Sequence, residues 1–211
     1  EGIERANPEV RPFVLTRANY IGGQRYAATW TGDNAAEWYD LENSISMILN
    51  LGLSGQPFAG PDIGGFIGNG TPELFGRWMG IGALLPFSRG HTGKGNIDKE
   101  PWAFTDEVTR LSRLSLQRRY RLIPYLYTLF REHAVNGMPV MRPLFFADPD
   151  DPALRTEDDA FLLGSDLLVV AQVTRPADQV HALPKGIWRP IDLVGAAGEP
   201  ELPDVHLRGG A

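Results

Sequence analysis

Short apolar runs alternate with helix-like segments along most of the chain. After Asp33 and Asn34, apolar side chains recur at spacings of three and four, as on one buried face of a helix. A second helix is predicted to start at Thr71 and Pro72, and a third covers about residues 105–135. This alternation predicts an α/β fold with a parallel sheet and crossover helices. The apolar runs are PFVLTRA (12–18), QPFAGPDIGGF (56–66), GIGALLPFSRGH (80–91) and PVMRPLFF (139–146).

Polar residues fall at the carboxyl ends of the first three apolar runs. Arg17 closes the first run, Asp62 lies where the second breaks into a glycine-rich loop, and His91 ends the third. In a (β/α)8 barrel the carboxyl ends of the strands carry the active site, whereas the opposite ends carry stability. These three side chains are therefore candidates for one site.

The pattern changes in the last third of the chain. Residues 147–160 are acidic, contain proline and show no periodicity, as expected of a linker or domain boundary. Short apolar stretches at 162–173, 181–195 and 202–207 follow, separated by glycine and proline turns. They predict a small all-β, sandwich-like domain.

Composition limits the possible functions. The 211 residues are 43% hydrophobic and carry a net charge of −6, so the chain can bury a core but would repel nucleic acid and anionic lipid. It contains no cysteine, which excludes disulfides, thiolate nucleophiles and cysteine metal sites. No apolar run approaches the length of a membrane span. Together with the negative net charge, this means that we expect neither nucleic acid nor a membrane as partner.

Asp33 lies in the stretch TWTGDNAAEW at residues 29–38, directly before the first predicted helix. An aspartate there has an ordinary role, because Asp and Asn are favoured helix N-caps. Its place behind Trp30 and Gly32 is also where a barrel enzyme would hold a catalytic acid. The residues alone leave both roles open.

Three motifs occur together in a recognisable order: LTRANYIGGQRYAATWTGDN, PFAGPDIGGF and LLPFSRGH. In this order they resemble the catalytic domain of glycoside hydrolase family 31, a family of retaining α-glucosidases and α-xylosidases. The stretch LPKGIWRPIDLVG is similar to the C-terminal β domain of that family. The resemblance covers nearly the whole chain and weakens after about residue 195.

The resemblance implies a role for individual side chains. Asp33, in the motif W-x-G-D-N, is implied as the general acid/base, and Arg89 as a residue that braces the pocket. No metal or organic cofactor belongs to this chemistry. The positions implied to bind the sugar whose bond is cut are Arg17, Trp30, Asp62, Phe66 and His91.

Retaining hydrolysis requires two carboxyl groups roughly 5 to 5.5 Å apart, a nucleophile and an acid that later acts as a base. To hold its proton near neutrality, Asp33 would need a raised pKa, which burial beside Trp30 and a neighbouring carboxylate would supply. Residues alone would pair Asp33 with Asp62 and make one of the two the nucleophile. The resemblance instead implies a nucleophilic aspartate in a W-x-D-M-N-E type motif, and this sequence contains no such motif.

We therefore interpret residues 1–147 as the C-terminal half of a (β/α)8 barrel, and residues 148–211 as a linker with the start of the β domain. The nucleophile is expected upstream, so the upstream half of the barrel is a required partner and the 211 residues alone are expected to be inactive. The absence of a signal peptide slightly favours the cytoplasm, but has little weight if residues precede Glu1.

Each assignment has a simpler alternative. Asp62 could be a turn residue held by its own backbone, and Arg17 could pair with a surface carboxylate. His91 alone would be an ordinary loop residue, and Trp30 or Phe66 alone would be core. We interpret the other three histidines as structural, and the basic face of the 105–135 helix as a solvated surface.

Two functional hypotheses remain. The first is a hydrolase of α-glucosides, with α-xylosides as the alternative substrate. The second is a noncatalytic carbohydrate-binding or interaction fragment.

Overall fold

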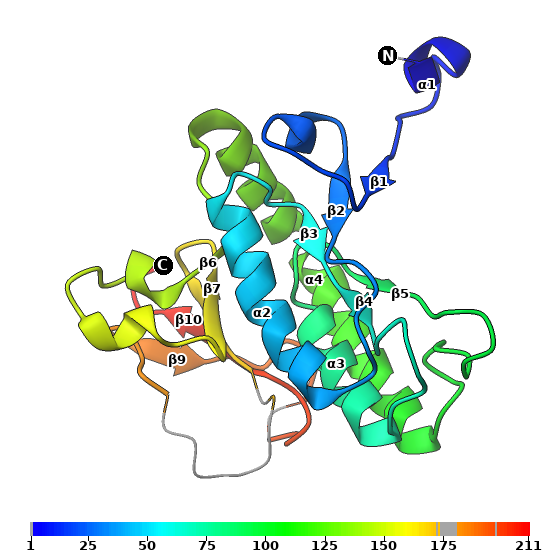
Figure 1. The fold of residues 1–211 in the computed structure, drawn as a ribbon. Coiled ribbons are helices and arrows are strands. Elements are labelled where there is room, and N and C mark those ends of the chain that lie inside the picture. Colours follow the sequence, from blue (N-terminus) through cyan, green and yellow to red (C-terminus); the bar gives the residue numbers. More distant parts are fainter. Residues whose placement is uncertain (1, 172, 174–180, 197) are drawn as a thin grey trace.

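The computed structural model describes residues 2–171, 173, 181–196 and 198–211 (Figure 1). The first five strands, which follow the N-terminal helix α1 (Gly2–Ala6), pair in parallel, as the alternation of apolar runs predicts. The order is β1–β2–β3 in one sheet and β4–β5 in another. These strands are β1 (Leu15–Thr16), β2 (Ala28–Trp30), β3 (Ala59–Gly60), β4 (Asp62–Ile63) and β5 (Arg89–Gly90).

Pro61 separates β3 from β4 within a single extended segment. Proline has no backbone N–H and therefore interrupts a ladder of strand hydrogen bonds. On its amino side Gly60 is paired with Trp30 of β2, and on its carboxyl side Asp62 is paired with Arg89 of β5. One segment thus connects the strand that precedes Asp33 to the strand that precedes His91.

Helix α2 (Trp38–Leu53) contacts β3 on one side. On the other side it contacts β6 (Met141–Arg142), which belongs to a second, antiparallel sheet (Figure 1). Five apolar positions were predicted for its buried face. Leu41, Ile45, Ile48 and Leu49 are at most 6% exposed, whereas Trp38 is half-buried and packs against the same core. Its N-cap is Glu37 rather than Asp33 or Asn34. The simpler role of Asp33 as a helix cap is therefore wrong, because four residues separate it from the first residue of the helix.

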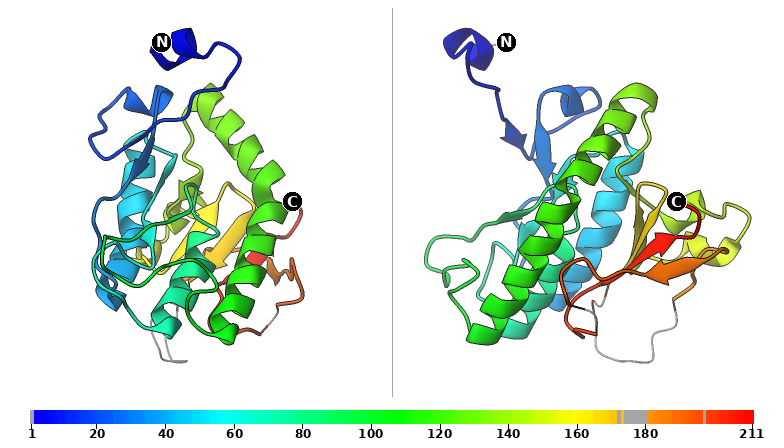
Figure 2. Two further views of the ribbon diagram at one scale, coloured as in Figure 1. Left: turned by 90° about the vertical axis from the view of Figure 1, so that its right-hand side faces the viewer. Right: turned by 180° about the vertical axis from the view of Figure 1, so that it is seen from behind.

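Helices α3 (Pro72–Gly82) and α4 (Asp106–Asn136) pack against each other. Both begin as predicted, because the hydroxyl of Thr71 accepts a hydrogen bond from the Leu74 N–H and the hydroxyl of Thr105 accepts one from Val108. Seen from behind, α4 runs diagonally across most of the height of the molecule, and the N-terminal helix α1 stands higher than its upper end (Figure 2). Within the described residues, no helix combines the length and the apolar character that crossing a bilayer requires.

The second sheet is antiparallel, with the order β6–β7–β8–β10–β9. The apolar run at 139–146 forms β6, which pairs with β7 and not with the parallel strands, although the sequence analysis placed residues 1–147 in the barrel. A fully buried strand shows the same apolar pattern in either kind of sheet, so its partner could not be inferred. These strands are β6 (Met141–Arg142), β7 (Ala160–Leu163), β8 (Leu167–Val170), β9 (Trp188–Pro190) and β10 (Asp204–Arg208).

The acidic segment between β6 and β7 is folded against the second sheet. It contains the 3-10 helices η2 (Leu144–Phe146) and η3 (Pro152–Arg155), in addition to η1 (Gly23–Arg25) near the N-terminus. Leu154 is 1% exposed and packs in a cluster with Leu162 and Leu168. The segment is therefore a packed connection and not a solvated tether.

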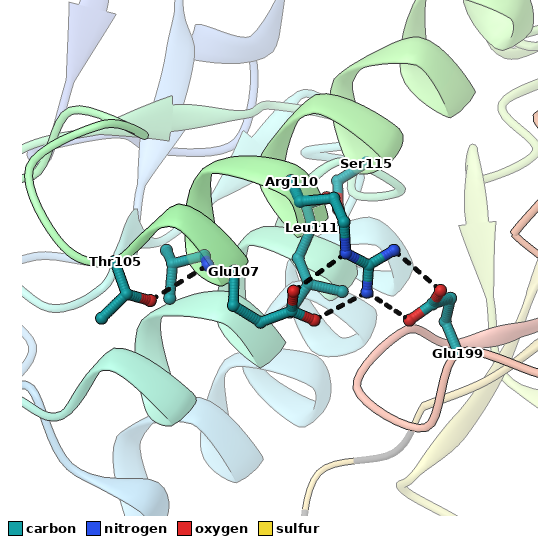
Figure 3. A network of polar contacts seen from close by, with 7 residues as sticks. Thr105, Glu107, Arg110, Leu111, Ser115 and Glu199 are labelled. Atoms are coloured by element: carbon teal, nitrogen blue, oxygen red, sulfur yellow. Dashed lines mark hydrogen bonds and ion pairs between the residues drawn. The ribbon is translucent and has the colours of Figure 1, made fainter.

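Two arginines of α4 bind the segment that precedes β10. The guanidinium of Arg110 forms ion pairs with Glu107 on its own helix and with Glu199, and these contacts lower the pKa of both carboxyl groups (Figure 3). Arg118 is buried and donates to the carbonyl oxygens of Pro203 at 2.8 Å and Ala196 at 3.4 Å. Helix α4 is therefore joined to the segment before β10 by hydrogen bonds and an ion pair, in addition to the apolar core that it shares with the second sheet.

Replacing Arg118 by methionine is expected to destabilise the protein by about 1–3 kcal/mol, because two buried carbonyl groups lose their donor. Urea unfolding of the full-length protein measures this change. Arg113, which is exposed on the same helix, supplies the matched control Arg113→Met, expected to stay within about 0.5 kcal/mol. Equal unfolding midpoints for the two variants would show that Arg118 does not secure this contact.

Candidate active site

Asp33 follows β2 at the carboxyl edge of the parallel strands. Gly32, with φ of 100°, turns the chain out of the strand, and the Asp33 side chain is 46% exposed. The burial expected for Asp33 beside Trp30 is therefore wrong for the described residues. Its Oδ2 atom lies 3.4 Å from Nη1 of Arg17, which follows β1. Because β1 and β2 are adjacent and parallel, their carboxyl ends bring the acid and the arginine together, as the sequence analysis predicts.

Asp62 lies on β4 and is completely buried. Its Oδ1 atom accepts hydrogen bonds from Nε of Arg89 at 3.1 Å and from Nη2 of the same guanidinium. The Arg89 guanidinium also lies over the Trp30 ring, with its central carbon 5.2 Å from the ring centroid. Arg89 thus connects the carboxylate of β4 to the aromatic residue that ends β2.

Several buried polar atoms at this point have no hydrogen-bond partner among the described residues. They include Oδ2 of Asp62, Nε1 of Trp30 and Oδ1 of Asn34. Buried polar groups in folded proteins are almost always paired, so each of these atoms still has an unused donor or acceptor.

Phe66 and His91 form the other part of the site. Their rings stack at 5.2 Å between centroids, with an interplanar angle of 25°. Phe66 lies on the loop that follows β4, and His91 follows β5 directly. An aromatic face beside an exposed imidazole suits a sugar, whose C–H surface is apolar and whose hydroxyl groups are polar.

Asn34 joins these parts, and the sequence analysis gave it no role beyond a possible helix cap. Its side-chain Nδ2 donates to the backbone oxygen of Asp62 at 3.1 Å. Its backbone carbonyl oxygen accepts hydrogen bonds from the backbone N–H groups of Phe66 and Ile67. Gly65 permits this close approach, because a Cβ there would lie 2.4 Å from the backbone nitrogen of Ala36.

All seven predicted site residues are therefore connected, either by direct contacts or through residues next to them in the sequence. They are Arg17, Trp30, Asp33, Asp62, Phe66, Arg89 and His91. They do not form one closed cavity. A cavity of about 230 Å³ adjoins the site and is lined by Gly90, His91, Thr92, Lys99 and Glu100. A larger one of about 500 Å³ includes Phe13, Ala28 and Phe58, at the amino ends of the strands, where a barrel does not hold its active site.

Parallel strands whose carboxyl ends gather carboxylates, arginines and aromatic side chains have the arrangement expected of one part of a (β/α)8 barrel. Residues 1–129 match the TIM-barrel domain of glycosyl hydrolases family 31, and residues 137–211 match the C-terminal domain of the same family. The chain belongs to glycosyl hydrolase family 31. The expected family and fold class are thereby confirmed.

Relatives and solved structures agree with this assignment. The chain is 51% identical to a probable glucan 1,3-alpha-glucosidase of Arabidopsis thaliana over 84% of its length, and 46% identical to alpha-glucosidase 2 of Bacillus thermoamyloliquefaciens over 89%. It spans only 19% and 24%, respectively, of the length of those two proteins.

The crystal structure of a family 31 alpha-glucosidase from Bacteroides thetaiotaomicron matches the whole chain and 35% of its own, with 53% identity and a TM-score of 0.90. A Flavobacterium johnsoniae family 31 dextranase complexed with glucose matches 99% of this chain and 28% of its own, with 33% identity and a TM-score of 0.89.

Proposed function

We propose that the protein containing this chain is a retaining α-glucosidase in which Asp33 is the general acid/base. One observation carries the proposal. Asp33 has no capping role, lies at the carboxyl edge of the parallel strands, and belongs to the same chain of contacts as Arg17, Trp30 and Asp62. The α-glucosidases among its relatives suggest the α-glucoside as substrate.

In the proposed reaction a carboxylate from the upstream half attacks the anomeric carbon while Asp33 donates its proton to the leaving oxygen. Asp33 then takes a proton from water, which attacks the anomeric carbon and releases the enzyme carboxylate. Two displacements at one carbon preserve the anomeric configuration. The exposure of the Asp33 side chain leaves it accessible to both the leaving group and water.

Asp62 suits substrate binding better than attack. A nucleophilic carboxylate needs an oxygen atom directed at the anomeric carbon, whereas Oδ1 of Asp62 is held by two donors of Arg89. Its second oxygen, Oδ2, retains the capacity to accept a hydrogen bond from a sugar hydroxyl group or from the upstream half. Arg17 and His91 supply further polar contacts, and Trp30 and Phe66 supply aromatic faces.

The stereochemical course tests the proposal. The full-length protein is expected to hydrolyse an aryl α-glucoside and to release α-glucose first, as followed by proton NMR before mutarotation. The 211 residues alone, without the upstream carboxylate, are expected to give no turnover. Initial release of β-glucose, or turnover by the isolated chain, would contradict the proposal. Faster hydrolysis of the matched α-xyloside would reassign the substrate.

A further inference from the structure

Lys99 is a buried cation outside the set of residues assigned to the site. It is 6% exposed and lies on the connection between β5 and α4. Its ammonium group donates to the carbonyl oxygens of Gly64 at 2.7 Å, Gly68 at 2.9 Å and Gly65. Transferring a charge from water is costly unless polar groups replace its hydration. Three converging carbonyl groups use all three donors of the ammonium.

The loop that surrounds Lys99 has an unusual backbone. Gly64, Gly65 and Gly68 have φ values of 83°, 79° and 80°, a region that residues with a side chain rarely adopt. These left-handed turns direct the carbonyl groups of Gly64, Gly65 and Gly68 toward the ammonium group instead of along a strand or helix. Without a cation at their centre, those dipoles would repel one another and lack a donor.

This loop carries the aromatic residue of the site. Phe66 lies between Gly65 and Gly68, and its carbonyl accepts hydrogen bonds from the N–H of Gly93 at 2.9 Å and from Nδ2 of Asn96 at 2.8 Å. Those two donors belong to the same connection as Lys99, which also begins with His91. Lys99 therefore lies where the Phe66 loop and the His91 loop are joined.

The charge of Lys99 also acts on Asp62. Burial lowers the pKa of Lys99, and the nearby carboxylate of Asp62 opposes that change. The ammonium thus interacts favourably with the buried carboxylate through its charge, while Arg89 of β5 forms the direct ion pair with it.

We propose that Lys99 is a positioning residue of the sugar-binding rim, which gathers the Gly64–Gly68 loop around its ammonium group and thereby holds Phe66 against His91. The inference rests on the proposed function, because it assigns Phe66, His91 and Asp62 to sugar binding. Lys99 itself contacts no reacting atom in this arrangement. Its loss misplaces the residues that contact the sugar, whereas Asp33 keeps its place after the end of β2.

The test replaces Lys99 by methionine, which is unbranched and only one atom shorter and which removes the charge. In the full-length protein, KM for p-nitrophenyl α-glucoside and the inhibition constant of glucose are both expected to rise roughly tenfold, since small displacements of positioned groups weaken binding strongly. The matched control is Lys94→Met, which removes an exposed lysine from the same connection. It is expected to leave both constants unchanged.

The two constants separate positioning from a general loss of structure. Partial unfolding lowers the concentration of active enzyme, so kcat falls while KM and the inhibition constant stay the same. That outcome, or wild-type values for all three, would overturn the inference. If Lys99→Met does not fold, Lys99→Gln retains two donors without a charge, and the same rise in both constants is expected.

Failure of the proposed function would be distinguishable. A wild-type protein that hydrolyses no α-glucoside would overturn the enzymatic assignment, whereas an active wild-type protein with an unaltered Lys99→Met variant would overturn only the role of Lys99. In the first case, calorimetric titration with glucose still compares the wild-type protein with Lys99→Met. Equal affinities would then overturn the positioning role as well.

Discussion

Replacement of Asp33 by asparagine in the full-length protein is expected to lower kcat/KM for an alkyl α-glucoside by about 10²–10⁴-fold, the range that a positioned general acid contributes. An alkoxide is a poor leaving group and must be protonated as the bond breaks. Asparagine keeps the size of the side chain but has no acidic proton. Glu37→Gln, four residues further along and exposed, is the matched control and is expected to retain wild-type turnover.

The leaving group identifies what Asp33 does. Fluoride departs without a proton, so kcat/KM of Asp33→Asn for α-glucosyl fluoride is expected to remain within about tenfold of the wild-type value. Initial rates with the two substrates give the comparison. An equal loss for both would assign Asp33 to binding and not to acid catalysis. Unchanged hydrolysis of the alkyl glucoside would remove the enzymatic role of this residue.

The starts of α3 and α4 were predicted well because their signals are local. Thr71 followed by Pro72 places a hydroxyl acceptor and a preset φ at the start of α3, and Thr105 caps α4 in the same way. Such a cap depends on atoms within four residues of one another. Tertiary contacts are not needed to recognise it.

The strands were predicted less well because their partners lie far away in the sequence. β2 has only three residues, and its tryptophan and threonine also belong to the motif around Asp33, so no separate strand was predicted there. The run that contains β6 is apolar whichever sheet it joins, and its pairing with Leu162 and Leu163 is set by the folded chain. Periodicity cannot supply that information.

The site shows the same division. The prediction that Arg17, Asp62 and His91 lie near one another followed from the general rule that barrels hold their sites at the carboxyl ends of the strands. The roles of Asn34 and Lys99 could not be predicted, because both act on backbone carbonyl groups. A carbonyl group has no signature in a sequence, so only the fold shows which side chain reaches it. The glycines at 64, 65 and 68 were the available signal for Lys99.

Replacement of Asp62 by asparagine is expected to lower kcat/KM for the α-glucoside by roughly 10²-fold, as when positioned substrate contacts are lost. It also removes the charged acceptor of Arg89, at a cost of roughly 1.5–3 kcal/mol of stability. Arg89 then loses its fixed place over Trp30. Steady-state kinetics and urea unfolding measure the two effects, with Asp98→Asn, exposed on the connection after β5, as the control.

A trapped intermediate separates this binding role from nucleophilic attack. A 5-fluoro-α-glucosyl fluoride slows the second displacement, so the wild-type enzyme should accumulate a covalent glycosyl ester on its nucleophile. Because Arg89 holds Oδ1 of Asp62 through two donors, we expect the labelled peptide to lie upstream of residue 1. A label on Asp62 would show that this carboxylate attacks the sugar, and that the two carboxylates of the reaction both belong to this chain.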